Sequence, residues 1–571
     1  MRAHRGALAL GAAIALAMAS PQADAGGFLR AQGTRIVDAD GKPVVLRGVG
    51  LGGWMLQEGY MLELTGDGTQ RSIRARIQDL VGEQATRDFY TAWLDHHTTK
   101  DDIDAMAAWG FNSVRLPMHY ELYTAPVEEE KVPGQQTWRE DGFRRTDQLL
   151  SWVKANGMVL ILDLHAAPGG QGNDLNISDR DPAKPSLWDS AANQDKMVAL
   201  WKKLAQRYRD EPAIAAYDII NEPNWGFSDP ADRHGCAEKE NTPLRQLLVR
   251  TTQAIREVDR NHIIAIEGNC WGNNYRGVLD DKPWDDNLVV SFHKYWNATT
   301  PDTLQDLLAL SQRWQVPLWL GETGENSNEW FSATAALVEA HGIGWAAWPL
   351  KKIRYNNPLQ IVANDGYSKV AAYWRGEGPR PTRGEALNAL DTLARHDIAF
   401  GNNVQHPDVV DAWLRAPHSD RSVPFKDHRI GADGGRIGAA DFDMGRNGVA
   451  YFDQAAVNVS GKPDTAWNPS MAYRNDGVAL SVKDGVARVV DFNPGEWLKY
   501  TLSDEAGGVR SLRVIGDPGR VRIVLNGDDA GTVATGKPVQ VRLLPGRNTL
   551  VIESASKGLA VDAVQLSPGG R

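Results

Sequence analysis

Two glutamates that lie far apart in the sequence occupy positions from which they could act on one bond. Glu222 lies in an Asn-Glu-Pro sequence and Glu322 in a Gly-Glu-Thr sequence, each at the end of a short apolar run. Cleavage of a glycosidic bond needs a carboxylic acid that protonates the leaving oxygen and a carboxylate on the opposite side of the anomeric carbon. Isolated glutamates are usually solvated loop charges. The pair is therefore a catalytic candidate only if the fold brings the two strand ends together.

The elements that would carry these glutamates form a regular alternation. Between about residues 40 and 350, short apolar runs alternate with amphipathic helical patterns, which is typical of parallel strands covered by helices on both sides. A count of eight runs favours a closed (β/α)8 barrel over an open doubly wound sheet. The predicted strands are Val44–Leu46, Ser113–Leu116, Met158–Leu162, Ile214–Ile220, Ile263–Ile266, Leu288–Phe292, Leu318–Leu320 and Ile343–Trp348.

Most of these runs have, at or just beyond their carboxyl end, a residue that could contact a substrate. The carboxyl ends of the strands of a (β/α)8 barrel carry its active residues. We therefore expect these side chains to converge at one end of the barrel. They are Arg115, His165, Asn221, Glu222, Glu267, His293, Glu322 and Trp348.

The sequences around these positions resemble family 5 of the glycoside hydrolases, the cellulase family. The resemblance covers about residues 35–375 and matches eight hallmark positions in order. It implies a retaining mechanism through a glycosyl-enzyme intermediate, with no metal or cofactor required. The matching sequences are SVRLP around Arg115, DLH at His165, NEP with Asn221 and Glu222, SFHKY with His293 and Tyr295, then Glu322 and Trp348.

The resemblance also implies a role for each residue. Glu222 would be the general acid/base and Glu322 the nucleophile, and the negative charge of Glu322 would raise the pKa of Glu222. The other residues would bind substrate or orient the pair. Arg115 would hold Glu322 ionised, Tyr295 would donate to it, Asn221 would bind the sugar 2-OH, His165 and His293 would position sugar hydroxyls and Glu222, and Trp348 would form the floor of the subsite.

Two loops narrow the substrate class. Residues 47–54 and 165–171 resemble the exo-β-1,3-glucanase and β-glucosidase members of the family more than its open-cleft cellulases. We therefore expect action on β-linked glucan or oligosaccharide. A transglycosylase and an endo-β-1,4-glucanase or mannanase remain alternatives among enzymes. A non-catalytic glycan-binding scaffold is a further alternative, but it predicts the loss of one carboxylate, and both are present.

Residues 48–53 also match the G-x-G-x-x-G pattern of dinucleotide-binding sites. That site needs a second strand with an acidic residue about 20 positions further on. The residues that follow, Trp54 to Glu58, do not provide one. The glycines are therefore expected to shape the first barrel loop.

Composition and the N-terminus indicate an exported glycan-binding protein. The net charge of −10 argues against nucleic acid as a partner, and the 20 tryptophans offer flat faces that suit sugars. Arg2, Arg5, the apolar residues 7–19 and Ala23-Asp24-Ala25 predict a signal peptide over residues 1–25 and a secreted or periplasmic location. No other segment is long enough to span a bilayer, and we expect a monomer.

Two cysteines, Cys236 and Cys270, follow the fourth and fifth predicted strands. In an oxidising compartment they could form one disulfide, which would rigidify the rim of the site. Two free thiols are the alternative.

The periodicity changes after about residue 414. We assign residues 26–415 to the barrel, 416–435 to a Gly- and Pro-containing linker and 436–571 to a β-sandwich, because its strands alternate apolar and polar residues. Several short sequences, among them Asp441-Phe442-Asp443 and GEWLKY at 495–500, resemble carbohydrate-binding modules of families 6 and 35. Gly438 and Ala440 stand where such modules often carry calcium-binding glutamates, which leaves a structural calcium in doubt. The candidate ligand aromatics are Tyr451, Trp467 and Tyr473.

Overall fold

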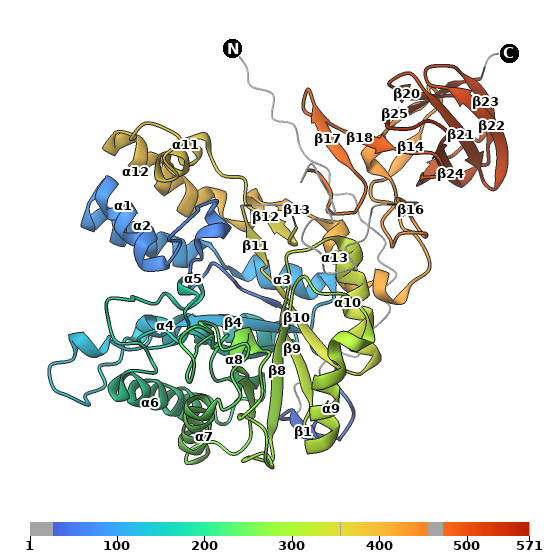
Figure 1. Ribbon diagram of the computed structural model, residues 1–571. Coiled ribbons are helices and arrows are strands. Elements are labelled where there is room, and N and C mark those ends of the chain that lie inside the picture. The colour runs from blue at the N-terminus through green and yellow to red at the C-terminus, as the bar shows by residue number, and fades with distance from the viewer. Residues whose placement is uncertain (1–26, 354–355, 455–471, 570–571) are drawn as a thin grey trace.

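The first domain is a closed barrel of eight parallel strands (Figure 1). The computed structural model describes residues 27–353, 356–454 and 472–569, so the predicted signal peptide 1–25 and Trp467 lie outside the described residues. Every strand of the barrel pairs with its sequence neighbours, and the last strand closes on the first, which confirms the predicted (β/α)8 barrel. The strands are β3 (Arg47–Gly50), β4 (Ser113–His119), β5 (Val159–Ala166), β6 (Ile214–Asp218), β7 (Ile263–Glu267), β8 (Leu288–Lys294), β9 (Leu318–Gly324) and β10 (Gly344–Trp348).

The first barrel strand lies further along the chain than predicted. The apolar run Val44–Leu46 only leads into β3, which runs through the glycine-rich sequence instead. A Cβ atom at Gly48 would lie 2.5 Å from Ser113 Oγ, and one at Gly50 would lie 2.4 Å from the Trp348 ring. Glycine in a strand interior marks a close approach of this kind, which apolar periodicity cannot reveal.

Helices between the strands cover the barrel and bury their apolar faces in one core with it. One of them, α3 (Lys100–Trp109), begins with a capping box formed by Thr99 and Asp102 and ends at Gly110 in the left-handed conformation. The others include α4 (Glu140–Ala155), α6 (Ala191–Tyr208), α7 (Thr242–Arg256), α9 (Gln305–Trp314) and α10 (Asn328–Ala340).

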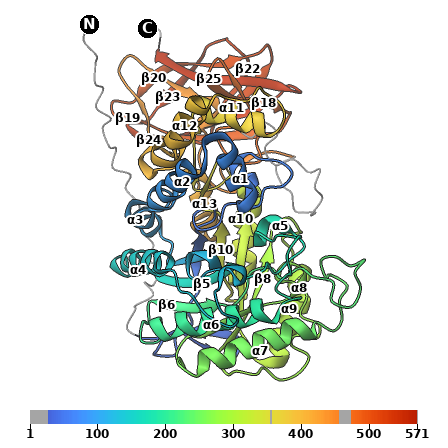
Figure 2. The same cartoon turned by 90° about the vertical axis from the view of Figure 1, so that its left-hand side faces the viewer.

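Four further helices form a separate layer beside the barrel. They are drawn from both ends of the barrel sequence and enclose their own apolar cluster. Figures 1 and 2 both show them gathered on one side of the molecule. They are α1 (Gln70–Val81), α2 (Glu83–His96), α11 (Asp365–Trp374) and α12 (Arg383–Thr392). None of the helices among the described residues is long and apolar enough to cross a membrane.

The C-terminal domain is the predicted β-sandwich. Each of its two sheets contains six strands among the described residues, and an apolar core lies between them. One sheet contains β14 (His428–Ile430), β16 (Tyr451–Phe452), β19 (Trp497–Asp504), β21 (Arg520–Leu525), β22 (Asp528–Ala534) and β24 (Gly546–Ser554). The other contains β15 (Gly435–Gly438), β17 (Leu480–Lys483), β18 (Val486–Phe492), β20 (Gly508–Gly516), β23 (Val539–Leu543) and β25 (Leu559–Pro568).

The predicted linker, residues 416–435, is folded and belongs to the domain boundary. Within it, β14 pairs in parallel with β19 of the sandwich. The Arg415 guanidinium donates to the carbonyl oxygens of Arg421 and Met444 and so fastens the segment to both sides. The Gly and Pro residues led to the prediction of a linker, and a three-residue strand that pairs with a distant partner leaves no periodic signal. Figure 1 shows the sandwich beside α10 and α13 (Pro407–Leu414).

Candidate active site

Arg115 organises the centre of the site at the carboxyl ends of the strands. It lies in β4 and is fully buried. Its guanidinium lies 2.7 Å from Glu322 Oε2 and within 3.3 Å of three other carboxylates, those of Asp163, Asp218 and Glu267. A buried arginine needs such partners because an unpaired charge would be costly. The cation and these carboxylates hold one another in place.

The two predicted catalytic glutamates meet at this centre. An oxygen of Glu222, an oxygen of Glu322 and a ring nitrogen of His293 lie within 4.8 Å of one another. Glu222 and Glu322 are 6% and 5% exposed, whereas Arg115 is 0% exposed. Both carboxyl groups, and His293 at 5% exposed, are therefore more accessible than Arg115.

The backbone at Glu222 aims its side chain into the site. Its φ of 46° lies in the left-handed region, which is unusual for a residue other than glycine. The backbone N–H of Glu222 donates to Glu267 Oε2 at 2.7 Å, which fixes this conformation. Backbone conformations of this kind concentrate at functional sites.

Burial raises the pKa of Glu222 to about 7. The nearby His293 opposes this shift, while the negative charges of Glu322 and Glu267 add to it. A carboxyl with this pKa can hold a proton near neutral pH and release it to a base. The environment of Glu222 is therefore that of a general acid/base.

Each oxygen of Glu322 accepts a hydrogen bond. Arg115 Nη1 donates to Oε2 at 2.7 Å, and the Tyr295 hydroxyl donates to Oε1. Burial and the negative charge of Glu322 raise the pKa of Tyr295 well above its usual value, so the phenol keeps its proton. These two donors fix the orientation of the Glu322 carboxyl group.

His293 bridges Glu222 and Glu267. Its Nδ1 lies 2.6 Å from Glu222 Oε1, and its Nε2 lies 3.2 Å from Glu267 Oε1. Burial disfavours the charged ring, but the surrounding carboxylates outweigh burial and raise the pKa of His293 well above its usual value. Ligand atoms of Glu222, His293 and Glu322 also have the spacing of a cation site.

His165 is held in the neutral form. Its Nδ1 lies 2.7 Å from Asp163, and its Nε2 lies 3.3 Å from the side-chain amide of Asn221. Burial lowers the pKa of His165 to about 3. Asn221 also accepts from Arg115 at 2.8 Å, so both predicted sugar-binding residues are fixed by neighbours at the centre.

Trp348 ends β10 and lies against His165. The two rings stack with centroids 5.0 Å apart and planes 7° apart. The indole N–H donates to the Tyr60 hydroxyl at 3.1 Å. A Cβ atom at Gly50 or Gly52 would lie less than 3 Å from the indole ring. Gly50 at the end of β3 and Gly52 shortly after it therefore make room for Trp348.

Several residues at the centre escaped the sequence analysis. Glu58 follows the glycine-rich loop, is buried, and has its Oε1 4.0 Å from His165 Nε2. Burial and the charge of Glu322 raise the pKa of Glu58 well above its usual value. No periodicity marks a loop residue of this kind. Asp163 and Asp218 follow or lie within predicted strands but had no predicted role, and Glu267 was expected at this end of the barrel without a role. The structure places all three beside Arg115.

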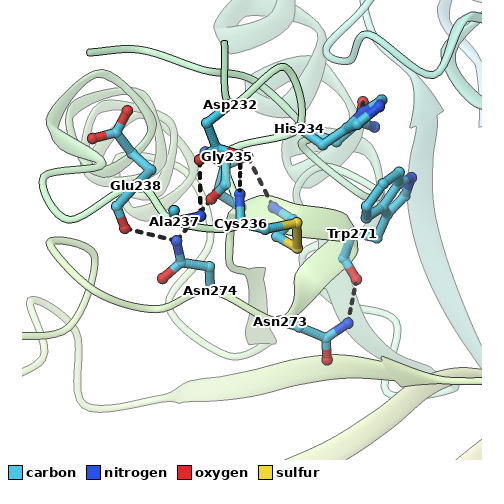
Figure 3. The surroundings of a disulfide bond; sticks show 12 residues. Asp232, His234, Gly235, Cys236, Ala237, Glu238, Trp271, Asn273 and Asn274 are labelled. Atoms are coloured by element: carbon cyan, nitrogen blue, oxygen red, sulfur yellow. Dashed lines mark hydrogen bonds between the residues drawn. A yellow bond between two sulfur atoms is a disulfide. The ribbon is translucent and has the colours of Figure 1, made fainter. Parts of the chain in front are cut away.

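A disulfide joins two loops at the rim of the site (Figure 3). Cys236 and Cys270 have Cα atoms 4.7 Å apart, in the loops after β6 and β7. Beside it, Trp271 stacks on His234 with ring centroids 4.5 Å apart, and its backbone N–H donates to the carbonyl oxygen of Pro223 at 3.1 Å. The disulfide therefore fastens the loop directly after Glu222 to the neighbouring loop.

The candidate ligand aromatics of the sandwich are placed differently from one another. Tyr451 is 0% exposed in the domain core, so the prediction that its ring binds a ligand is wrong. Alternation along a strand cannot tell which of two sheet faces a short edge strand buries. Tyr473 is partly exposed, and its hydroxyl donates to Asp441 beside Lys426. Trp467 lies outside the described residues.

The fold and the paired carboxylates define a site of the glycosidase type, and comparison with known proteins agrees. Residues 78–353 match the family Cellulase (glycosyl hydrolase family 5), which covers seven of the eight barrel strands, β4 to β10. This family match and the names of similar proteins support a glycosidase.

Three curated proteins illustrate the similarity. A "Beta-xylosidase" of Phanerodontia chrysosporium is 34% identical over 47% of this chain and 52% of its own length. An "Endoglucanase C" of Acetivibrio thermocellus is 30% identical over 35% of this chain and 51% of its own. A "Probable glucan 1,3-beta-glucosidase A" of Aspergillus niger is 29% identical over 37% of this chain and 49% of its own length. The chain thus spans about half the length of the curated relatives it matches.

Proposed function

We propose that the protein is a retaining β-glycosidase that hydrolyses O-glycosyl bonds. The observation that carries this proposal is the approach of Glu222 and Glu322 to within 4.8 Å. Retaining enzymes hold their two carboxyl groups about 5–5.5 Å apart, whereas inverting enzymes leave about 6.5–9.5 Å for a water molecule. The short separation supports direct attack by one carboxylate on the anomeric carbon.

The proposed reaction has two steps. The Glu322 carboxylate attacks the anomeric carbon, the bond to the leaving oxygen breaks, and that oxygen takes the proton of Glu222. Water then attacks the glycosyl ester, gives a proton to Glu222 and releases Glu322. The raised pKa of Glu222 serves both steps, because the same group must first donate and then accept a proton.

We propose β-linked glucan or oligosaccharide as the substrate, with exo-β-1,3-glucanase or β-glucosidase action favoured over open-cleft endoglucanase action. The loop sequences at 47–54 and 165–171 support this choice, as does the similarity to a protein named as a glucan 1,3-beta-glucosidase. Relatives named as a xylosidase and an endoglucanase make the choice one to test directly.

A mechanism-based inhibitor tests the reaction. The full chain is incubated with a 2-deoxy-2-fluoro-β-glucoside that has an activated leaving group, and peptides are analysed by mass spectrometry. We expect a covalent sugar on Glu322. In a separate reaction with a β-glycoside that is turned over, we expect NMR to show a product with retained anomeric configuration. Absence of an adduct with every β-glycoside tried would favour a non-catalytic scaffold. Product analysis on laminarin, β-1,6-glucan, cellulose and mannan, with and without added acceptor sugar, then assigns linkage and separates hydrolysis from transglycosylation.

We also propose that residues 1–25 direct export and that the sandwich binds glycan. The charged and apolar pattern of residues 1–25 supports export, and the partly exposed ring of Tyr473 supports a glycan contact. Cell fractionation with N-terminal sequencing tests the first proposal. Affinity electrophoresis of Tyr473→Ala against the unaltered chain tests the second.

A further inference from the structure

A short buried segment of the sandwich lies against the barrel. Residues 474–476 are 0%, 0% and 3% exposed. They lie against the start of α10 and against α13, which are both barrel elements. The loop that precedes α10 follows β9, the strand that carries Glu322. The domain boundary is therefore only a few residues away from the nucleophile along the chain.

Asn475 makes four hydrogen bonds across this boundary. Its backbone N–H donates to Asp408 Oδ2 at 2.9 Å, and its carbonyl oxygen accepts from the Asn328 N–H at 3.0 Å. Its side-chain Nδ2 donates to the carbonyl oxygen of Asn326 at 2.8 Å and to Asn328 Oδ1 at 3.1 Å. Buried hydrogen bonds of this kind are costly to break, because the groups left behind have no water to bind.

The side-chain bond of Asn475 continues to the catalytic centre. Asn326, which is 1% exposed, donates through its own Nδ2 to the carbonyl oxygen of Tyr295 at 3.0 Å. The Tyr295 hydroxyl in turn donates to Glu322 Oε1. The sandwich is thus connected with the nucleophile by three hydrogen bonds, which are joined through the covalent structure of Asn326 and Tyr295.

The sandwich side of this connection is firmly anchored. The Arg474 guanidinium pairs with Asp476 at 2.6 Å and lies between the rings of Phe425 and Phe442, 4.3 and 3.8 Å from their centroids. It also donates to the carbonyl oxygen of Asp443 at 3.1 Å. Asn475 is therefore presented to the barrel from a rigid part of the sandwich.

We infer that Asn475 is a positioning residue of the active site, which holds Tyr295 in hydrogen-bonding contact with Glu322 through Asn326. The sandwich then forms part of the framework of the catalytic centre and is more than a tethered module. This inference rests on the proposed function for the roles of Tyr295 and Glu322. The inference requires that the effects of changing Asn475 and Tyr295 depend on each other. A double-mutant cycle measures this dependence.

The experiment compares Asn475→Ala with unaltered full-length protein on a 2,4-dinitrophenyl β-glycoside. The substitution removes the side-chain donor to Asn326 and Asn328 and leaves both backbone bonds intact. We expect kcat to fall about three- to tenfold, the range that one buried hydrogen bond corresponds to, while KM changes less than twofold. Asn326→Ala approaches the same connection from the barrel side, and the same loss of kcat is expected.

The cycle with Tyr295→Phe separates positioning from general destabilisation. If Asn475 acts through Tyr295, Asn475→Ala has no further effect on kcat in the Tyr295→Phe background. Equal effects in both backgrounds would overturn the inference. Asn548→Ala is the matched control, because Asn548 is a buried amide bonded only to backbone and side chains within the sandwich. Its kcat should stay unchanged even if its unfolding temperature falls.

The two proposals fail in different ways. An unaltered chain that cleaves no β-glycoside would end the proposed function itself. An active chain in which Asn475→Ala matches Asn548→Ala would overturn only the role of Asn475.

Discussion

The Nδ1 atom of His293 lies 2.6 Å from Oε1 of Glu222, so a protonated imidazole faces the proposed acid directly. A nearby positive charge favours the ionised form of a carboxyl group and lowers its pKa. Burial nevertheless dominates and keeps the pKa of Glu222 at about 7. The charge of His293 therefore limits how far burial raises the pKa of Glu222.

This relationship predicts the pH profile. Glu222 must be protonated to donate, so kcat/KM should fall about tenfold per unit at pH values above its pKa of about 7. His293→Ala removes the cation, which raises the pKa of Glu222 further, so the basic limb should move to higher pH while the maximal rate falls. His262→Ala is the control, because His262 is buried beside Asp259. A basic limb that stays in place in His293→Ala would contradict the assignment.

Replacement of Glu222 by Ala tests its role as the acid/base. We expect a loss of about 10²–10⁴-fold on glycosides with poor leaving groups, the usual contribution of general acid–base catalysis. Dinitrophenyl glycosides need no protonation, so their glycosylation step should be spared, and azide should restore turnover as a β-glycosyl azide. Glu322→Ala should be inactive on both substrates under the same assay. Full activity of Glu222→Ala on a disaccharide would refute the role.

The strand ends were predictable because they combine two signals that are local in sequence. Glu322 and His293 each follow an apolar run. The run predicts the strand, and the barrel fold predicts that the carboxyl ends of its strands meet at one site. Glu58 and Tyr60 carry no such signal. They reach the centre only because the loop after β3 folds back toward His165 and Trp348.

The errors have the same origin in contacts between distant residues. The first barrel strand was displaced because Gly48 and Gly50 look like loop residues until the side chains of Ser113 and Trp348 are placed beside them. Likewise, β14 was assigned to a linker because its strand partner, β19, lies about 70 residues away along the chain. Local composition does not record such pairings.

Replacement of Arg115, the positively charged residue at the centre of the site, should destabilise the barrel in a pH-dependent way. Arg115→Met leaves several buried carboxylates without their cation, a loss of about 3–5 kcal/mol in the free energy of unfolding. Burial already raises the pKa values of Asp163 and Asp218, and loss of Arg115 raises them further. A carboxyl group whose pKa is raised in the folded state makes the folded protein less stable as pH rises. The loss in the free energy of unfolding caused by Arg115→Met should therefore be greater at pH 8 than at pH 5.

Urea unfolding followed by tryptophan fluorescence measures this difference. Arg87→Met is the control, because Arg87 and Glu83 form an ion pair in which both side chains are largely exposed. Solvent screens such pairs, so the control should unfold at nearly the same urea concentration as the unaltered chain. An Arg115→Met variant equally stable at both pH values would argue against the buried carboxylate cluster.

The glycines beneath Trp348 predict an effect of a single methyl group on catalysis. In Gly50→Ala the new Cβ would lie 2.4 Å from a carbon of the indole ring, which is rigid and stacked on His165. The ring must move, so we expect kcat/KM to fall at least about tenfold, since small displacements of site residues cost up to about 10²-fold. Gly384→Ala, in α12, meets no atom within 4 Å and should raise stability slightly without changing kcat/KM. Unchanged kcat/KM in Gly50→Ala would show that the ring of Trp348 does not form the subsite floor.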